Sequence, residues 1–386
     1  MAVDSSAPSS RRRSLFDALF GEAWGLERRR RRRYVALVLL MCLAAAVALS
    51  LTGRGKSSPA AIGPAKPLGL TAAGAVDIGS SPQALLPNAG SLWIATPNST
   101  VRLNLRNGSM IARIPIPTNG VNAGLAFGAG SVWLAPTGTS QLLRIDPTTD
   151  RIVAKINLGV ARNGRISSLG GGVAFAADRL WVSRASNRPR GDVVSINPSN
   201  NHATARPITV GSGPDTIVSA FGALWVDNTS VVVGDKAPSA TYPALSRIDP
   251  RTRHVTTEPF SGTPATGFGS LWVQTDAGAD DAAIIRVNPA TGQTLAQIAV
   301  PRVIGVASGD GRVWAISYPR SRSASLFEAI KGTAELWQID PTTNRVIGKP
   351  THLSLTQPVS IAVSGQQLWI ADYQSGKVIH FQLTKR

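Results

Sequence analysis

The sequence predicts an all-β protein: a seven-bladed β-propeller closed by an N-terminal strand that completes the last blade, preceded by a single transmembrane helix. Two repeated motifs and one apolar run predict this fold. A Leu-Trp or Val-Trp motif recurs every 40–55 residues, in related forms such as GSLW and GSVW. A second motif, such as IDPTT or INPSN, follows most copies. The apolar run holds 19 uncharged residues and directly follows six arginines.

The first 74 residues divide into three segments. Residues 1–33 form a basic tail, which we expect in the cytoplasm because Lys and Arg flank membrane helices on that side. Residues 34–52, from Tyr34 to Thr52, are long enough to cross a bilayer as a helix. Residues 53–74 are rich in Gly, Pro and Ala, which is typical of a flexible linker. The sequence therefore predicts a single-pass cell-membrane protein whose remaining residues, 75–386, lie outside the cytoplasm.

Other interpretations of this N-terminal region are weaker. A cleavable signal peptide would have a shorter apolar region and a small-residue cleavage site, and this run ends in Ser-Leu-Thr-Gly without one. We therefore expect an uncleaved signal anchor. The arginine run lies directly beside the apolar segment, so we interpret it as a topology signal and expect no nucleic-acid partner. The single cysteine, Cys42, excludes an intramolecular disulfide framework.

Each repeat is expected to contain four short strands. The first is small and apolar, the second carries the tryptophan, the third ends at the Asx-Pro motif, and the fourth is an alternating run such as RIVAKINLG (Arg151 to Gly159). Antiparallel units of four strands repeated at this spacing are typical of a β-propeller. The last repeat ends after its third strand, whereas AVDIG (Ala75 to Gly79) resembles a fourth strand. We expect it to pair there, leaving no unpaired edge.

The repeated residues have structural explanations. The tryptophans share one position in every repeat, which favours packing between neighbouring sheets over ligand stacking: Trp93, Trp133, Trp181, Trp225, Trp272, Trp314 and Trp369. Asp or Asn before Pro is typical of a turn, because its side chain bonds to the backbone ahead and Pro restricts φ. This applies to Asp146, Asn197, Asp249, Asn288 and Asp340.

Sequence variation concentrates on the opposite face from these turns. The loops between the second and third strands lengthen in repeats 3, 4 and 6, and long loops on one face of a repeat protein usually mark its binding face. Aspartates such as Asp227 and Asp235 fall in the repeat 4 loop. Arginines in repeats 3 and 6 suggest recognition of an anion. The predicted binding residues are Arg162, Arg165, Arg184, Arg188, Arg190, Arg320 and Arg322.

One repeat resembles a known family. The segment GAGSVWLA…LLRIDPTTDRIVAKINLG (Gly128 to Gly159) resembles the YVTN-type propeller repeat of bacterial surface proteins, a group similar to virginiamycin B lyase-like propellers. The resemblance covers residues 75–386 and implies the fold. The lyases of this group use a His/Glu cluster with a divalent metal at the propeller centre. Here the histidines fall on or beside outer strands: His202, His254, His352 and His380.

The sequence therefore favours a membrane-anchored, extracytoplasmic module that binds a ligand or protein, or acts as a scaffold, without catalysis. It predicts no catalytic residue, metal site or cofactor. Its expected partners are the membrane, through the single span, and an anionic envelope ligand or a protein. Two alternatives stay open: a streptogramin lyase-like metal-dependent enzyme, and a sensor that signals through a cytoplasmic partner.

Overall fold

The computed structural model describes most of the repeat region. The described residues are 65–117, 121–159, 168–185, 190–204, 206–228, 244–260, 262–275, 283–318 and 333–384. The predicted tail, the predicted span and most of the predicted linker therefore lie outside them. Within the described residues, no helix is both long and apolar enough to cross a membrane.

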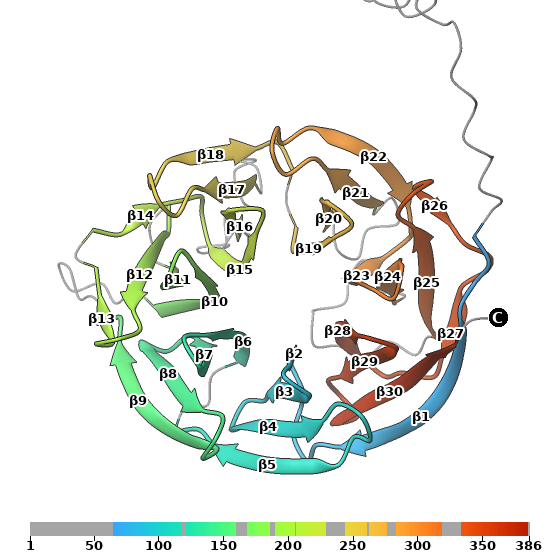
Figure 1. Cartoon of the computed structure of the whole chain (residues 1–386), viewed down its shortest axis with the longest axis horizontal. Helices are drawn as coiled ribbons and strands as arrows, with labels where there is room; N and C mark the ends of the chain where they lie inside the picture. Colours follow the sequence, from blue (N-terminus) through green and yellow to red (C-terminus); the bar gives the residue numbers. More distant parts are fainter. Residues whose placement is uncertain are drawn as a thin grey trace, which may run out of the picture. The chain divides into compact units, whose positions relative to one another are not determined.

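The described residues form seven antiparallel sheets arranged in a ring, which confirms the predicted seven-bladed propeller (Figure 1). In each blade the strand nearest the ring axis is the first, here called strand a, followed outward by strands b, c and d (Figure 1). Blade 1 contains β2 (Ala84–Asn88), β3 (Ser91–Ala95), β4 (Ser99–Asn104) and β5 (Met110–Pro115). Blade 2 contains β6 (Val121–Gly128), β7 (Ser131–Thr137), β8 (Gln141–Asp146) and β9 (Arg151–Asn157).

The next four blades repeat this order. Blade 3 contains β10 (Ser168–Ala176), β11 (Arg179–Ala185), β12 (Asp192–Asn197), β13 (His202–Ala203) and β14 (Ile208–Thr209). Blade 4 contains β15 (Pro214–Ala220), β16 (Ala223–Asn228), β17 (Ala244–Ile248) and β18 (Val255–Glu258). Blade 5 contains β19 (Pro264–Gly267), β20 (Ser270–Gln274), β21 (Ala283–Val287) and β22 (Thr294–Ala299). Blade 6 contains β23 (Val303–Gly309), β24 (Arg312–Ser317), β25 (Ala334–Asp340), β26 (Arg345–Val346) and β27 (Thr351–Leu353). In blades 3 and 6, strand d is split into two short segments that both pair with strand c.

Blade 7 combines the two ends of the described chain. It contains β28 (Pro358–Ser364), β29 (Gln367–Asp372), β30 (Lys377–Thr384) and, as its outermost strand, β1 (Gly69–Asp77). β1 pairs antiparallel with β30, from Gly69 opposite Thr384 to Asp77 opposite Lys377, with a bulge near Gly74. The strand therefore begins at Gly69, inside the stretch that the sequence analysis assigned to the linker. Residues 69–74 are mostly small and carry little strand propensity, so this extension of the strand before Ala75 was not visible in the sequence.

The tight turns between strands a and b follow from their backbone angles. In six blades both central residues have positive φ, as a type I′ turn requires: Ala89–Gly90, Ala129–Gly130, Ala177–Asp178, Phe221–Gly222, Phe268–Gly269 and Asp310–Gly311. Type I′ turns match the twist of the strands they connect, which is why they close two-residue hairpins. The glycine three residues before most tryptophans therefore suits the positive φ of this turn position.

The Asx motif forms the turn between strands c and d, as predicted. In blade 2 the Asp146 carboxylate accepts a hydrogen bond from the Thr148 N–H at 2.8 Å. The same bond recurs at 2.8 Å from Arg251 to Asp249 and at 2.8 Å from Thr342 to Asp340. These bonds hold the pKa of Asp146 and Asp249 below the usual aspartate range, because they stabilise the ionised carboxylate.

The seven tryptophans pack between blades, which confirms the structural interpretation. Each is at most 2% exposed. Trp133 of blade 2 lies in one core cluster with Leu180 and Val182 of blade 3. The same arrangement joins Trp369 of blade 7 to Leu92 of blade 1, so the tryptophan packing continues across the ends of the ring.

Glycines let the inner strands of blades 2, 3 and 4 approach closely. A Cβ atom at Gly170 would lie 1.9 Å from the Pro214 carbonyl oxygen, and one at Gly172 would lie 1.9 Å from the Asp215 carbonyl oxygen. A real Cβ cannot occupy either place without moving backbone. The Gly-Gly-Gly run of β10 therefore sets the spacing between blade 3 and its neighbour.

We predict that Gly172→Ala destabilises the propeller by about 2 kcal/mol or more, since the added methyl forces β10 away from β15. The measurement is the free energy of unfolding from urea denaturation. Ser219→Ala, at an exposed position of β15, is the control and should change the free energy by less than about 0.5 kcal/mol. Equal stability of Gly172→Ala and the parent would contradict the close approach.

Candidate functional site

The predicted arginine group is only partly described. Arg162, Arg165, Arg188, Arg320 and Arg322 lie outside the described residues, so their positions stay a prediction. Arg190 is exposed just before β12. Arg184 requires a correction, because it lies within β11 rather than in the following loop.

Arg184 is 7% exposed and is bonded within the protein. Its Nε and Nη2 donate to the two carboxylate oxygens of Asp192, at 2.7 and 2.8 Å, and its Nη1 donates to the Leu158 carbonyl oxygen at 3.0 Å. Arg184 and Asp192 face each other across β11 and β12. The side chain therefore joins blade 3 to the end of blade 2, and it is not a free ligand-binding arginine.

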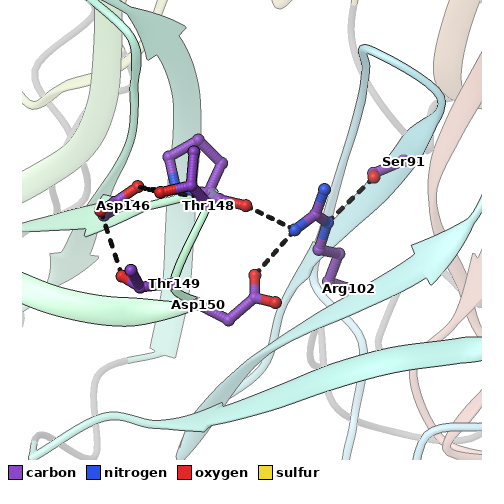
Figure 2. A network of polar contacts seen from close by, with 7 residues as sticks. Ser91, Arg102, Asp146, Thr148, Thr149 and Asp150 are labelled. Atoms are coloured by element: carbon purple, nitrogen blue, oxygen red, sulfur yellow. Dashed lines mark hydrogen bonds and ion pairs between the residues drawn. The ribbon is translucent and has the colours of Figure 1, made fainter.

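A different set of arginines, on strand c, connects consecutive blades. Figure 2 shows the first example, in which Arg102 of β4 reaches the c–d turn of blade 2. Its Nε donates to Ser91 Oγ at 2.9 Å, and its Nη1 donates to the Pro147 carbonyl oxygen at 2.6 Å and to the Asp150 carboxylate at 2.9 Å. The guanidinium also lies 5.0 Å from the centre of the Trp93 ring. We call this arrangement of Ser, Arg, Pro carbonyl and Asx the arginine latch.

Two further arginine latches repeat these contacts. Arg144 donates to Ser131 Oγ, to the Pro198 carbonyl oxygen and to Asn201 Oδ1, at 2.9, 2.8 and 3.0 Å. Arg286 donates to Ser270 Oγ, to the Pro341 carbonyl oxygen and to Asn344 Oδ1, at 2.8, 2.6 and 2.9 Å. A guanidinium with these acceptors, stacked on an aromatic face, gains from both charge-assisted hydrogen bonds and the cation–π interaction. The latches therefore align blade 1 with 2, 2 with 3, and 5 with 6.

The sequence analysis missed the arginine latch, although its signal was present. Arg precedes the turn motif in RLNL, RIDP and RVNP, Ser begins each partner strand b, and Asp or Asn ends the next turn. The arginine and the turn that it binds are 45–58 positions apart in the chain, so only the ring geometry brings them together.

A carboxyl pair in blade 4 forms a second group, of which sequence reasoning misplaced Asp227 and did not single out Asp215. Asp215 lies near the start of β15, and Asp227 lies near the end of β16 rather than in the following loop. Both positions are at the blade face that carries the b–c and d–a loops. Asp227 is buried and accepts hydrogen bonds from the Gly262 N–H at 3.1 Å and from Thr263 Oγ1 at 3.4 Å, both of the next blade.

Burial changes the proton affinity of this carboxyl pair. Burial, together with the charge of Asp227, raises the pKa of Asp215 to about 6. Burial also raises the pKa of Asp227, although the bonds from Gly262 and Thr263 oppose that change. Carboxyl groups with raised pKa values, at the face that carries the b–c and d–a loops, mark a candidate functional site. Within the described ranges, no group of three or more His, Cys, Asp or Glu residues could hold a metal ion.

The four histidines lie where the sequence analysis placed them. His202 is in β13, His352 is in β27, and His254 directly precedes β18. His380 of β30 is buried and stacks on Trp369, with ring centroids 3.7 Å apart. Burial lowers the pKa of His380, so the neutral imidazole is the favoured form there.

Comparison with known proteins identifies the fold and no family. No protein-family model matches the chain, and no curated protein sequence matches it. The structure of U3-55K is similar with a TM-score of 0.59 and 12% identity, covering 81% of this chain and 100% of that one. Hydrazine synthase of Kuenenia stuttgartiensis is similar with a TM-score of 0.57 and 10% identity, covering 84% and 99%.

A designed protein is also similar in fold. The computationally designed Ika8 protein is similar with a TM-score of 0.52 and 10% identity, covering 79% of this chain and 97% of that one. Likeness at these identities concerns the fold alone. The resemblance to YVTN-type repeats and lyase-like propellers therefore remains a resemblance.

We predict that Asp215→Asn stabilises the protein at about pH 7.5 by on the order of 2 kcal/mol. The pKa of Asp215 is raised to about 6, so its contribution to stability is fully present below the unfolded pKa near 3.8 and is lost as the pH rises through 6. Asparagine carries no charge to desolvate. The measurement is the melting temperature of both proteins between about pH 4 and 8.

The two melting curves should converge near pH 4, where the aspartate is largely protonated. Asp178→Asn, at the exposed tip of the blade 3 hairpin, removes the same charge and should leave the pH dependence unchanged. A constant difference between Asp215→Asn and the parent at every pH would contradict the raised pKa.

Proposed function

We propose that this protein is a membrane-anchored, extracytoplasmic propeller that binds a ligand or protein partner or acts as a scaffold, without catalysis. The observation that carries the proposal is the ring itself. Seven blades joined by buried tryptophans and arginine latches form a rigid support for the loops between them. A rigid scaffold that presents loops is suited to binding. The arginine-rich run and the apolar segment that precede the ring support the membrane location.

The N-terminal strand would have two roles in this arrangement. We propose that β1 closes the ring by completing blade 7, and that the same strand connects the ring to the anchor. Bonds beyond the strand pairing support this: the Gln338 side chain of blade 6 accepts from the Leu68 N–H at 2.8 Å and donates to its carbonyl oxygen at 3.0 Å. Arg312 donates to the Lys66 carbonyl oxygen at 2.9 Å. The entering segment is thus bonded to two neighbouring blades.

We predict that the ring is exported while the chain stays in the membrane. A reporter enzyme that folds only outside the cytoplasm should be active when fused after Arg386 and inactive when fused after residue 33. Deleting residues 34–52 should abolish reporter activity, because it removes the predicted span. Membrane fractionation with an N-terminal tag should show one full-length species. A soluble protein lacking the tag would indicate cleavage and overturn the anchor.

We predict that Arg188→Ala with Arg190→Ala weakens binding of an anionic polymer about tenfold or more, since each arginine can bind an oxyanion through charge-assisted hydrogen bonds. The probe is polyglutamate, titrated against the full-length protein in detergent. The replacement of Arg151 and Arg345 by Ala removes two exposed arginines of other blades and is the control. Arg184 stays in place because its loss would leave Asp192 unpaired. Equal weakening in both double variants would assign the binding to net charge alone.

A further inference from the structure

The interface between blades 4 and 5, here called the blade 4–5 seam, has an arginine at the latch position but lacks the serine and the Asx residue of the latch. Arg247 of β17 faces Trp225 across the sheet, as Arg102 faces Trp93. The acceptor serine at the start of strand b is replaced by Ala223, and the Asx that ends the next c–d turn is replaced by Gly292. The guanidinium lies 5.6 Å from the Trp225 ring centre, against 4.9–5.0 Å in the three latches.

Arg247 therefore lacks the serine and Asx acceptors to which the latch arginines bond. Its Nε is buried and has no hydrogen-bond partner. Within the described part of the chain, its terminal nitrogens donate none of the bonds that Arg102, Arg144 and Arg286 make. A guanidinium held on an aromatic ring with unfilled donors is a good receptor for an oxyanion, which accepts two parallel hydrogen bonds from it.

The other seams show that this combination is unusual within the molecule. The residue at the Arg247 position is Ser195 in blade 3, Gln338 in blade 6 and His380 in blade 7. In each of those three blades strand b does not begin with serine, and the following blade presents no Asx acceptor. The arginine is missing there too. Blade 4 alone among the seven keeps the arginine without the two acceptor side chains. The structural role of the latch arginines therefore does not account fully for the arginine at position 247.

Exposed aromatic side chains lie on the same face, at the a–b turns of blades 4 and 5. Phe221 and Phe268 occupy the tips of the a–b turns in blades 4 and 5, and they are 48% and 41% exposed. Both have a φ of 53°, which a bulky residue rarely adopts and which carries a steric cost. The other type I′ turns place Ala or Asp at this position. The two blades on either side of the blade 4–5 seam, which has no latch, therefore carry strained, solvent-facing phenylalanines at their turns.

We propose that the turn face of the blade 4–5 seam binds an oxyanion, a carboxylate or phosphate, carried on an apolar or ring-bearing group. The Arg247 guanidinium binds the oxyanion in place of the missing Asx side chain, and the apolar group packs on Phe221 and Phe268. Gly292 provides no acceptor side chain there, and the Glu258 carboxylate borders this position. This face is opposite the arginine-bearing loops of the proposed function. A negative binding result at one site therefore does not contradict the other.

One acidic group lies beside the site. A Cβ atom at Gly292 would lie 2.3 Å from a carboxylate oxygen of Glu258, so that carboxylate fills part of the space that a side chain at residue 292 would need. Glu258 is not within ion-pair distance of Arg247. Its charge opposes an incoming anion, so it limits affinity. Replacing Glu258 by Gln should strengthen anion binding a few-fold.

The test uses variants that differ in whether the Arg247 donors are available. Calorimetric titration of the full-length protein in detergent would use phenyl phosphate, benzoate and inorganic phosphate as probes. We expect phenyl phosphate to bind, and Arg247→Gln to weaken it about tenfold or more. Arg151→Gln removes an equal charge from exposed β9 and should leave binding unchanged. Phe221→Ala should weaken phenyl phosphate and benzoate but leave inorganic phosphate unaffected.

The sharpest variant rebuilds the latch. Ala223→Ser with Gly292→Asn supplies both missing acceptors, and Asn tolerates the positive φ of residue 292, as Asn201 and Asn344 do at equivalent positions. The flexible Glu258 side chain has to move aside. This variant should raise the melting temperature and lose phenyl phosphate binding, although Arg247 is intact.

The binding measurements can support or overturn the proposed oxyanion site. Loss of binding in both Arg247→Gln and the rebuilt-latch variant supports it, and a preference for phosphate or for carboxylate names the group. Absence of binding to the parent protein overturns it. Unchanged binding in a folded, more stable rebuilt-latch variant also overturns it, as does equal weakening by Arg151→Gln, which would make the binding a consequence of net charge.

Discussion

The structure depends on the burial of one tryptophan per blade against the next blade. The strand-b tryptophan of each blade is covered by residues of the next blade, so the core of each blade is completed by its neighbour. Burying an aromatic side chain of this size contributes several kcal/mol. The stability of each sheet is therefore shared with the next one. An arrangement of this kind is stable only when every blade has a neighbour on both sides.

The polar latches add orientation to this apolar packing. Tryptophan burial alone tolerates sliding between neighbouring sheets, because the hydrophobic effect is not directional. Arg102, Arg144 and Arg286 each bind a specific carbonyl oxygen and a specific Asx side chain in the next turn. Hydrogen bonds with fixed partners and short distances set the register between blades. The ring thus combines a non-directional driving force with directional bonds at its turn face.

The strands, the turns and the tryptophan packing could be predicted because they repeat. Seven copies of a motif report the same local environment, and Asx-Pro and positive-φ glycine chemistry act within a few residues. The chain positions of Arg184 and Asp227 could not be predicted in the same way. Both stand at the ends of strands b, where charged residues look like loop residues. Only the paired strand, through Asp192, or the neighbouring blade, through Gly262, reveals why they are buried.

Blade 7 shows why sequence variation within a repeat carries physical information. Its fourth strand comes from the other end of the chain, so blade 7 has no c–d turn to offer blade 6. An arginine at position 338 would have no Pro carbonyl or Asx acceptor to bind. A glutamine suits this position, because its amide both donates and accepts, and it bonds to the N–H and the carbonyl oxygen of Leu68 as a strand neighbour would.

The opposite side of blade 7 follows the same logic. The blade 1 turn ends in Gly108, and a Cβ atom there would lie 3.5 Å from the Trp369 ring. Gly108 supplies no Asx side chain, so an arginine opposite Trp369 would again lack that acceptor. His380 instead stacks flat on Trp369 and bonds to Gln367 within its own blade. The residue opposite each tryptophan therefore depends on what the next blade presents, and Arg247 is the position where that relation fails.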